Sequence, residues 1–204
     1  MQHIHSYLAL GDSYTIGEAV PIHESFPYIT TQLLRQEKIS MHAPEMVAKT
    51  GWTSTELAEH LLHTHLNQHY DFVTLLIGVN NQYRNLSVDN FKNDFEFLVK
   101  KAIHFAAGKN ERVFILSIPD WGYTPFAADK NKEQITKEID AFNLVCKQIA
   151  KQFHTPFIDI TTETRAFSSD PRAIATDGLH FSYETHMIWA KKLSESIQQS
   201  LKQN

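Results

Sequence analysis

The chain has 204 residues, of which 42% are hydrophobic and 21% charged, and 23 acidic against 19 basic side chains give a formal net charge of −4. This length and composition predict one soluble globular domain and exclude the disordered and fibrous classes. The acidic balance argues against nucleic-acid binding through phosphate neutralisation, and the single cysteine, Cys146, excludes a disulfide framework and a cysteine-rich zinc site.

The amino-terminal residues carry no signature of a targeting segment. Met1–His5 has no basic region, and the apolar run Tyr7–Leu10 ends at once in Gly11, whereas a secretory signal needs roughly 7–15 apolar residues. No stretch approaches the ~18 apolar residues of a membrane span. We therefore expect a cytoplasmic protein, although a chain whose leader had been removed would read in the same way.

Five short β-type runs alternate with five helical patterns along the chain. The predicted strands are Ile4–Leu10, Pro44–Ala48, Asp71–Ile77, Arg112–Ile118 and Thr155–Ile160. The predicted helices are Ser25–Glu37, Ser54–Leu66, Val88–Ala107, Lys132–Phe153 and Ser182–Leu201. The third and fourth runs are apolar on both faces, as buried parallel strands are. This alternation indicates βαβ units and a single doubly wound α/β domain whose parallel sheet is covered on both faces.

Small and polar residues follow every predicted strand. Because ligands bind at the carboxyl ends of the strands in open parallel sheets, we expect these segments to gather at one edge. In chain order they are Gly11-Asp12-Ser13-Tyr14, Lys49-Thr50-Gly51-Trp52, Gly78-Val79-Asn80-Asn81, Pro119-Asp120-Trp121-Gly122 and Asp177-Gly178-Leu179-His180. The candidate chemistry therefore lies at this edge.

These segments contain the residue types that nucleophilic catalysis requires. Ser13 is a nucleophile only where a base accepts its proton, and His180 has the side chain for that role. Asp177, three residues before His180, can bond its Nδ1–H and fix the tautomer. Candidate donors to a developing oxyanion are the backbone N–H groups of Ser13 and Gly51 and the side-chain amide of Asn80. No metal or organic cofactor is required for such a reaction.

Taken together, Gly11-Asp12-Ser13, Gly51, Gly78-Val79-Asn80 and Asp177-x-x-His180 resemble the blocks of the SGNH (GDSL) hydrolase family, in the family's order and over residues 8–180. The resemblance implies one domain over residues 1–204 with a three-layer α/β/α, flavodoxin-like fold of about five parallel strands in the order 2-1-3-4-5. It also implies Ser13 as nucleophile, His180 as general base, Asp177 as orienting acid, and an oxyanion hole formed by Ser13, Gly51 and Asn80.

Two positions depart from the family's usual residues. Tyr14 stands where leucine is common, and Asn81 stands where aspartate is usual. The second departure concerns how firmly the loop holds Asn80, and hence the rate of the reaction.

The sequence thus predicts a serine esterase that acts through an acyl-enzyme on a small-molecule ester. Thioester or lysophospholipid cleavage and acyl transfer at the same triad remain alternatives. A flavodoxin-like binding module without turnover is a third. No motif selects the acyl or alcohol part of the substrate, and the oligomeric state is not encoded in any pattern.

Two further groups of side chains have competing interpretations. Trp52, Trp121, Tyr123 and Phe126 either line an acyl or alcohol pocket or pack the loops onto the sheet. A second group, His60, His63, His65 and His69, is a candidate metal site. A hydrolase that uses a metal at this cluster is a distant alternative function. The four histidines lack an acidic partner at motif spacing, so a solvated helix end is the preferred interpretation. His3 and His5 are interpreted as edge or packing residues of the first strand.

Overall fold

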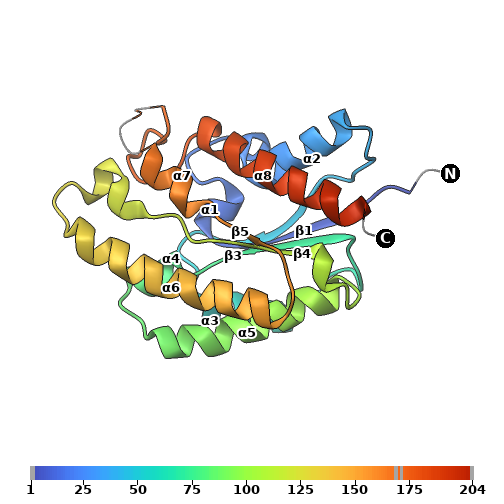
Figure 1. Cartoon of the computed structure of the whole chain (residues 1–204), viewed down its shortest axis with the longest axis horizontal. Coiled ribbons are helices and arrows are strands. Elements are labelled where there is room, and N and C mark those ends of the chain that lie inside the picture. Colours follow the sequence, from blue (N-terminus) through green and yellow to red (C-terminus); the bar gives the residue numbers. More distant parts are fainter. Residues whose placement is uncertain (1–2, 168–169, 171, 203–204) are drawn as a thin grey trace.

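A computed structural model describes residues 3–167, 170 and 172–202, and it shows a sheet between two layers of helices (Figure 1). The strands are β1 (Tyr7–Gly11), β2 (Glu45–Ala48), β3 (Phe72–Leu76), β4 (Val113–Leu116) and β5 (Phe157–Ile158). They lie in the order β2-β1-β3-β4-β5, and every neighbouring pair is parallel. The predicted three-layer, flavodoxin-like α/β fold is therefore confirmed.

The central strands are the most completely buried part of the chain. Every residue of β1, β3 and β4 is buried, as expected for parallel strands covered on both faces. The chain runs from β1 outward to β2 and then returns across β1 to β3. The strand order therefore reverses between β1 and β3, and the carboxyl ends of these two strands flank the crevice where ligands bind in such sheets.

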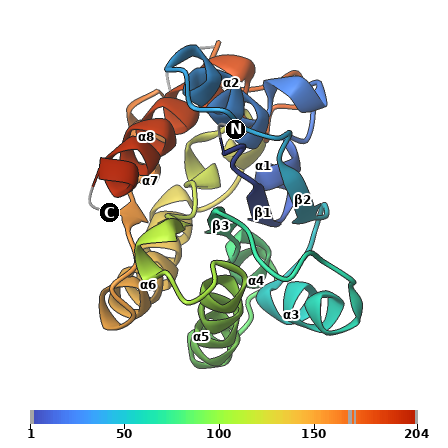
Figure 2. The ribbon, with the colours of Figure 1, turned by 90° about the vertical axis from the view of Figure 1, so that its right-hand side faces the viewer.

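The helices divide between the two faces of the sheet. One face carries α2 (Phe26–Gln36) and α8 (Tyr183–Lys202), and the other carries α3 (Ser54–His63), α5 (Val88–Phe105) and α6 (Lys132–Gln152), as the end-on view shows (Figure 2). In α5 the buried side chains are Phe91, Phe95, Leu98, Val99 and Ala102. This spacing forms the single apolar stripe of an amphipathic helix that rests on a core.

The contact between α2 and α8 includes a buried histidine. Nδ1 of His186 accepts the backbone N–H of Phe26 at 3.2 Å, and this N–H is one of the helix-terminal donors that have no intrahelical partner. Burial lowers the pKa of His186 to about 3. The ring is therefore a neutral acceptor at physiological pH, and His186 joins α8 to the first turn of α2.

Three short helices that the sequence analysis did not predict begin where strands end. They are α1 (Ser13–Ile16) after β1, α4 (Val79–Tyr83) after β3 and α7 (Thr161–Ala166) after β5. Each is too short to show an apolar period. Most predicted boundaries are shifted by a few residues, and the predicted fifth strand is reduced to two residues.

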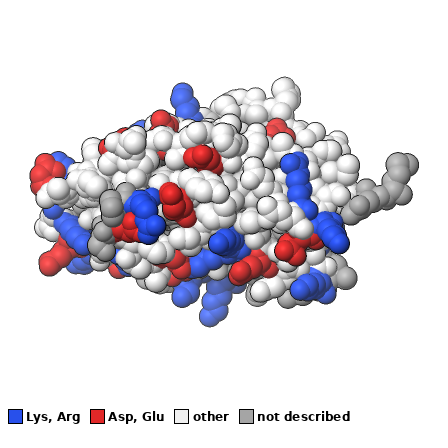
Figure 3. Space-filling model, turned by 90° about the horizontal axis from the view of Figure 1, so that it is seen from above, with Lys and Arg blue, Asp and Glu red and all other residues white. Residues whose placement is uncertain are grey.

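The surface is of mixed charge over the face seen from above, where acidic and basic side chains are interspersed (Figure 3). Among the described helices, none combines the length and the apolar character that crossing a membrane requires.

Candidate active site

A cavity of about 180 Å³ opens at the carboxyl edge of the sheet, where the segments that follow β1, β2 and β3 meet the one that precedes α8. Ser13, Gly51, Asn80 and His180 all line it. Asp177 does not line the cavity but contacts His180. The fold therefore brings Ser13 and His180, which lie 167 positions apart in the sequence, to the wall of one cavity.

Ser13 is the first residue of α1, directly after β1. Asp12 caps this helix, since its Oδ1 accepts the N–H of Tyr14 at 3.1 Å. The turn requires Gly11, because a Cβ there would lie 2.1 Å from Oγ1 of Thr15. The first residue of a helix has no intrahelical acceptor for its N–H. Ser13 therefore combines a hydroxyl with a backbone donor at one point of the cavity wall.

His180 and Asp177 form a close pair. Nδ1 of His180 lies 2.6 Å from Oδ2 of Asp177, while Oδ1 of Asp177 accepts the N–H groups of Leu179 and His180, each at 2.9 Å. Partial burial acts to raise the carboxyl pKa, but the hydrogen bonds from His180 and the two backbone groups outweigh it and hold the pKa of Asp177 below its usual value. An ionised carboxylate only accepts, so Nδ1 of His180 is the donor of this bond, and in the neutral ring Nε2 then carries the lone pair that a general base needs.

The segment that carries this pair is held by backbone bonds and by packing. Ile174 and Phe181 form an antiparallel bridge, and the N–H of Ala175 donates to the carbonyl of His180 at 2.8 Å. The ring of Tyr14 packs edge-on against the ring of His180, with centroids 5.8 Å apart. Tyr14, the residue that stands where leucine is common, thus connects the loop of Ser13 to the ring of His180.

Gly51 lies in the turn that follows β2. The N–H of Trp52 closes this turn on the carbonyl of Lys49 at 3.2 Å, and Gly51 has φ of +82°, a conformation that strains residues with a side chain. Its carbonyl accepts a hydrogen bond from Nη2 of Arg84 at 2.5 Å, and Nη1 of Arg84 pairs with Glu56 at 3.3 Å. Arg84 therefore sets the orientation of the Gly51 carbonyl.

Asn80 lies in the first turn of α4, which follows Gly78. A Cβ on Gly78 would come within 2.6 Å of Ile118, and its φ is +131°, so this entry into the helix requires glycine. The side-chain amide of Asn80 donates to the carbonyl of Trp52 at 2.9 Å. An amide nitrogen has two hydrogens, so this bond orients Asn80 and leaves its second N–H for the cavity.

Asn81, the second departure from the family's usual residues, is buried and does not face solvent. Its Oδ1 accepts the N–H of Ser54 at 2.9 Å, and its Nδ2 donates to Oγ of Ser54 at 2.8 Å. Ser54 is the first residue of α3. The loop after β3 is therefore joined by two bonds to the segment that carries Gly51.

The rest of the cavity wall is mainly apolar. Of the four aromatic residues predicted for a pocket, Trp121 and Phe126 line it, together with Tyr83. The three ring centroids are 5.4–6.4 Å apart, and Nε1 of Trp121 donates to Gln82 at 2.7 Å. Sequence reasoning missed Tyr83, although it lies three residues after Asn80 and hence on the same side of a helix.

Trp52 and Tyr123 do not line the cavity. Trp52 packs against His60 with ring centroids 4.7 Å apart, in a separate groove, and reaches the site only through its carbonyl. Nζ of Lys132 lies 3.4 Å from the ring centroid of Tyr123. In the described part of the chain, the predicted histidine cluster does not converge as a set of metal ligands.

Asp12 is the one buried carboxyl directly beside Ser13. Its side chain is 1% exposed, and among the described residues its Oδ2 has no hydrogen-bond partner. Burial raises the pKa of Asp12 to about 7, which the bond from the N–H of Tyr14 only partly offsets. Folding therefore favours the protonated form of this carboxyl.

The chain is similar to known proteins over most of its length. A sequence model of the GDSL-like Lipase/Acylhydrolase family matches residues 9–188. No curated protein sequence matches the chain. Three similar solved structures are TesA (16% identity, TM-score 0.74, covering 96% of this chain and 99% of that one), the acetylxylan esterase Axe2 from Geobacillus stearothermophilus (19%, 0.74, 97% and 96%) and the lipase/acylhydrolase from Enterococcus faecalis (19%, 0.73, 95% and 96%). At these identities the likeness shows a shared fold.

Proposed function

Since the chain belongs to the GDSL-like lipase/acylhydrolase family of ester-hydrolysing serine enzymes, we propose that it cleaves a carboxylic ester through an acyl-enzyme on Ser13. His180 is the general base in this proposal, and Asp177 orients it. The observation that carries the proposal is the 2.6 Å contact between Asp177 and His180, with His180 and Ser13 in the wall of one cavity.

The first half of the reaction forms the acyl-enzyme. Nε2 of His180 takes the proton of the Ser13 hydroxyl as Oγ attacks the ester carbonyl carbon, and Asp177 stabilises the imidazolium that results. Catalytic hydrogen bonds, such as the one from the Ser13 hydroxyl to Nε2 of His180 in this step, often tighten only in the complex with substrate. The negative charge on the former carbonyl oxygen is stabilised by the N–H groups of Ser13 and Gly51 and by the second amide N–H of Asn80.

The second half releases the products. His180 gives its proton to the leaving alkoxide as the bond between the carbonyl carbon and the ester oxygen breaks, and the alcohol departs. His180 then removes a proton from a water molecule, which attacks the acyl carbon. The second tetrahedral intermediate collapses to the carboxylic acid, and Ser13 recovers its proton from His180.

The size of the cavity bears on the substrate. A cavity of about 180 Å³ is smaller than the roughly 300–1,000 Å³ of pockets that enclose drug-sized ligands. Its aromatic wall shields a bound acyl group from water but leaves room for only a short acyl chain. This supports an acyl group of a few carbons, such as acetyl to butyryl.

The test measures hydrolysis of p-nitrophenyl acetate, butyrate and octanoate. We expect activity that falls with acyl length in the wild type and its loss in Ser13→Ala, while Ser196→Ala on α8 keeps it as a matched control. Undiminished hydrolysis in Ser13→Ala overturns the proposal. Stoichiometric phosphonylation of Ser13 by an organophosphonate, read by mass spectrometry, separates an enzyme from a binding module without turnover.

Thioester cleavage and acyl transfer use the same residues and are separated by products. Assays with acyl thioesters and with added alcohol acceptors measure each alternative against water as acceptor. The proposal is supported if hydrolysis of the oxygen ester is the dominant reaction. A higher kcat/KM for thioester cleavage or for acyl transfer shows that this other reaction is the function instead.

A further inference from the structure

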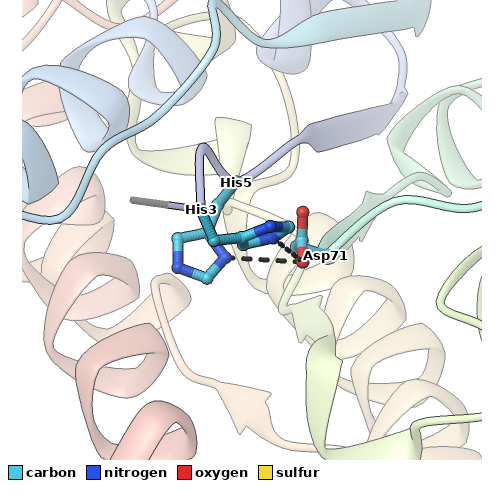
Figure 4. A group of neighbouring side chains, drawn as sticks. All are labelled: His3, His5 and Asp71. Atoms are coloured by element: carbon cyan, nitrogen blue, oxygen red, sulfur yellow. Dashed lines mark hydrogen bonds and ion pairs between the residues drawn. The ribbon is translucent and has the colours of Figure 1, made fainter. Parts of the chain in front are cut away.

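Three side chains with metal-binding atoms converge at the amino-terminal edge of the sheet, opposite the cavity. His3 and His5 precede β1, and Asp71 precedes β3, as the close view shows (Figure 4). Nε2 of His3 is 2.8 Å and Nδ1 of His5 is 3.4 Å from Oδ1 of Asp71. One ligand atom from each residue lies within 4.8 Å of the other two.

The backbone beneath two of these side chains is firmly held. The N–H of His5 donates to the carbonyl of Ser40, and the carbonyl of His5 accepts the N–H of His42, each at 2.8 Å. The N–H of Asp71 donates to the carbonyl of Ser6 at 3.1 Å. The relative position of His5 and Asp71 is therefore part of the sheet and not a chance contact of mobile side chains.

The carboxylate of Asp71 is oriented in the way that metal-binding carboxylates are. Its Oδ2 accepts both the N–H and the hydroxyl of Ser6, at 2.8 and 3.0 Å, which leaves Oδ1 directed at the two rings. Supporting bonds of this kind commonly fix the ligands of a metal. Nδ1 of His5 is buried and has no hydrogen-bond partner among the described residues.

We propose that His3, His5 and Asp71 form a binding site for a divalent cation of the zinc class. Two imidazoles and one carboxylate are the donors that such a cation takes, with water in the fourth position of a tetrahedron. Ligand bonds of about 2.0–2.1 Å place neighbouring ligand atoms about 3.3 Å apart, close to the separation of His5 from Asp71. Nε2 of His3 now contacts Oδ1 of Asp71 directly at 2.8 Å, and because the side chain of His3 is 66% exposed, its ring turns to exchange this contact for a bond to the cation.

The site acts on stability and not on the reaction. It joins the segment before β1 to the segment before β3, and the length of β1, roughly 17 Å for five residues at about 3.3 Å per residue, separates it from Ser13. A cation that binds only the folded chain stabilises it by mass action. Ester hydrolysis by the folded enzyme is expected to be unchanged by the cation.

The test uses Zn²⁺ in isothermal titration calorimetry and Co²⁺ in visible spectroscopy with the full chain. We expect saturable 1:1 binding, a Co²⁺ absorption typical of low coordination number, and a higher Tm with Zn²⁺. His3→Ala should weaken binding at least tenfold, and Asp71→Asn should abolish it together with the Tm shift. The control is His60→Ala/His63→Ala, which removes the exposed pair on α3 and should leave binding intact.

Absence of saturable binding in the wild type overturns the proposal. So does binding that survives both His3→Ala and Asp71→Asn but is lost in the His60/His63 control, because the cation is then held at α3. His3→Ala decides the matter if Asp71→Asn does not fold, since the exposed ring of His3 contributes little to packing.

Discussion

The hydroxyl of Ser54 donates a hydrogen bond to Oδ2 of Asp94 at 2.9 Å. The same hydroxyl accepts a bond from the side-chain amide of Asn81 at 2.8 Å. A carboxylate on α5 thus lies one serine hydroxyl away from Asn81, the position where aspartate is usual in the family. Through this chain of bonds, α5 supports the two loops that carry Gly51 and Asn80.

Asn81→Asp is expected to slow the enzyme. The new carboxylate cannot donate to Ser54, whose single hydroxyl hydrogen then serves only one of two like charges. A lost buried bond of this kind costs about 1–3 kcal/mol, so we expect kcat/KM for p-nitrophenyl acetate to fall roughly tenfold. Asp94→Asn in the same chain should restore it to within about threefold, because one carboxylate and one amide again flank Ser54. A double variant as slow as the single one contradicts this coupling.

Asn80→Ala is expected to lower kcat with little change in KM. The lost amide N–H serves the oxyanion of the transition state, and removal of one such donor costs about 2.7–4 kcal/mol, or roughly 10²–10³-fold in kcat. Steady-state kinetics with p-nitrophenyl acetate measures the effect. Asn90→Ala, an exposed position on α5, is the matched control and should keep wild-type rates. A rise in KM at constant kcat would instead assign Asn80 to substrate binding.

Asp12 is expected to make stability fall as pH rises. Its folded pKa of about 7 lies above the ordinary 3.8, so the folded chain binds a proton that the unfolded chain releases. The contribution of Asp12 is fully favourable below about pH 4 and is lost as pH rises through 7.

Asp12→Asn removes this dependence and keeps an oxygen for the N–H of Tyr14. Denaturant unfolding from pH 5 to pH 8 should show the variant gaining a few kcal/mol on the wild type across that range. Asp129→Asn, at an exposed side chain, should show no such gain. A constant difference between Asp12→Asn and wild type at all pH values contradicts the prediction.

Phe126→Ala is expected to shift acyl preference toward longer chains. The ring of Phe126 is 39% exposed and forms one wall of the cavity, so its removal opens space without emptying the core. The ratio of kcat/KM for octanoate over acetate should rise several-fold with p-nitrophenyl esters. Leu144→Ala on α6, an exposed apolar residue outside the cavity, should leave the ratio unchanged.

The fold and the gathering of the candidate site residues at one edge of the sheet could be predicted because both depend on local patterns. Runs that are apolar on both faces, such as those of β3 and β4, indicate buried parallel strands. In such a sheet, residues that directly follow strands meet at one edge. Ser13, Gly51 and Asn80 follow the first three predicted strands, and the position of His180 in the cavity agrees with the same reasoning.

The sequence by itself thus determined the class of fold, the strand order through the family resemblance, and the gathering of Ser13, Gly51, Asn80 and His180 at one edge of the sheet. Only the tertiary structure decided which neighbours each side chain meets. It placed Tyr83 in the cavity wall and the ring of Trp52 outside it, and it brought Asp71 to His3 and His5. These contacts depend on strand register and side-chain direction, which are set by packing between segments far apart in the chain. For this reason the histidine cluster of residues 60–69, close together in the sequence, does not form a group of metal ligands in the described part of the chain. His3 and His5 meet Asp71, which lies more than 60 residues later in the sequence.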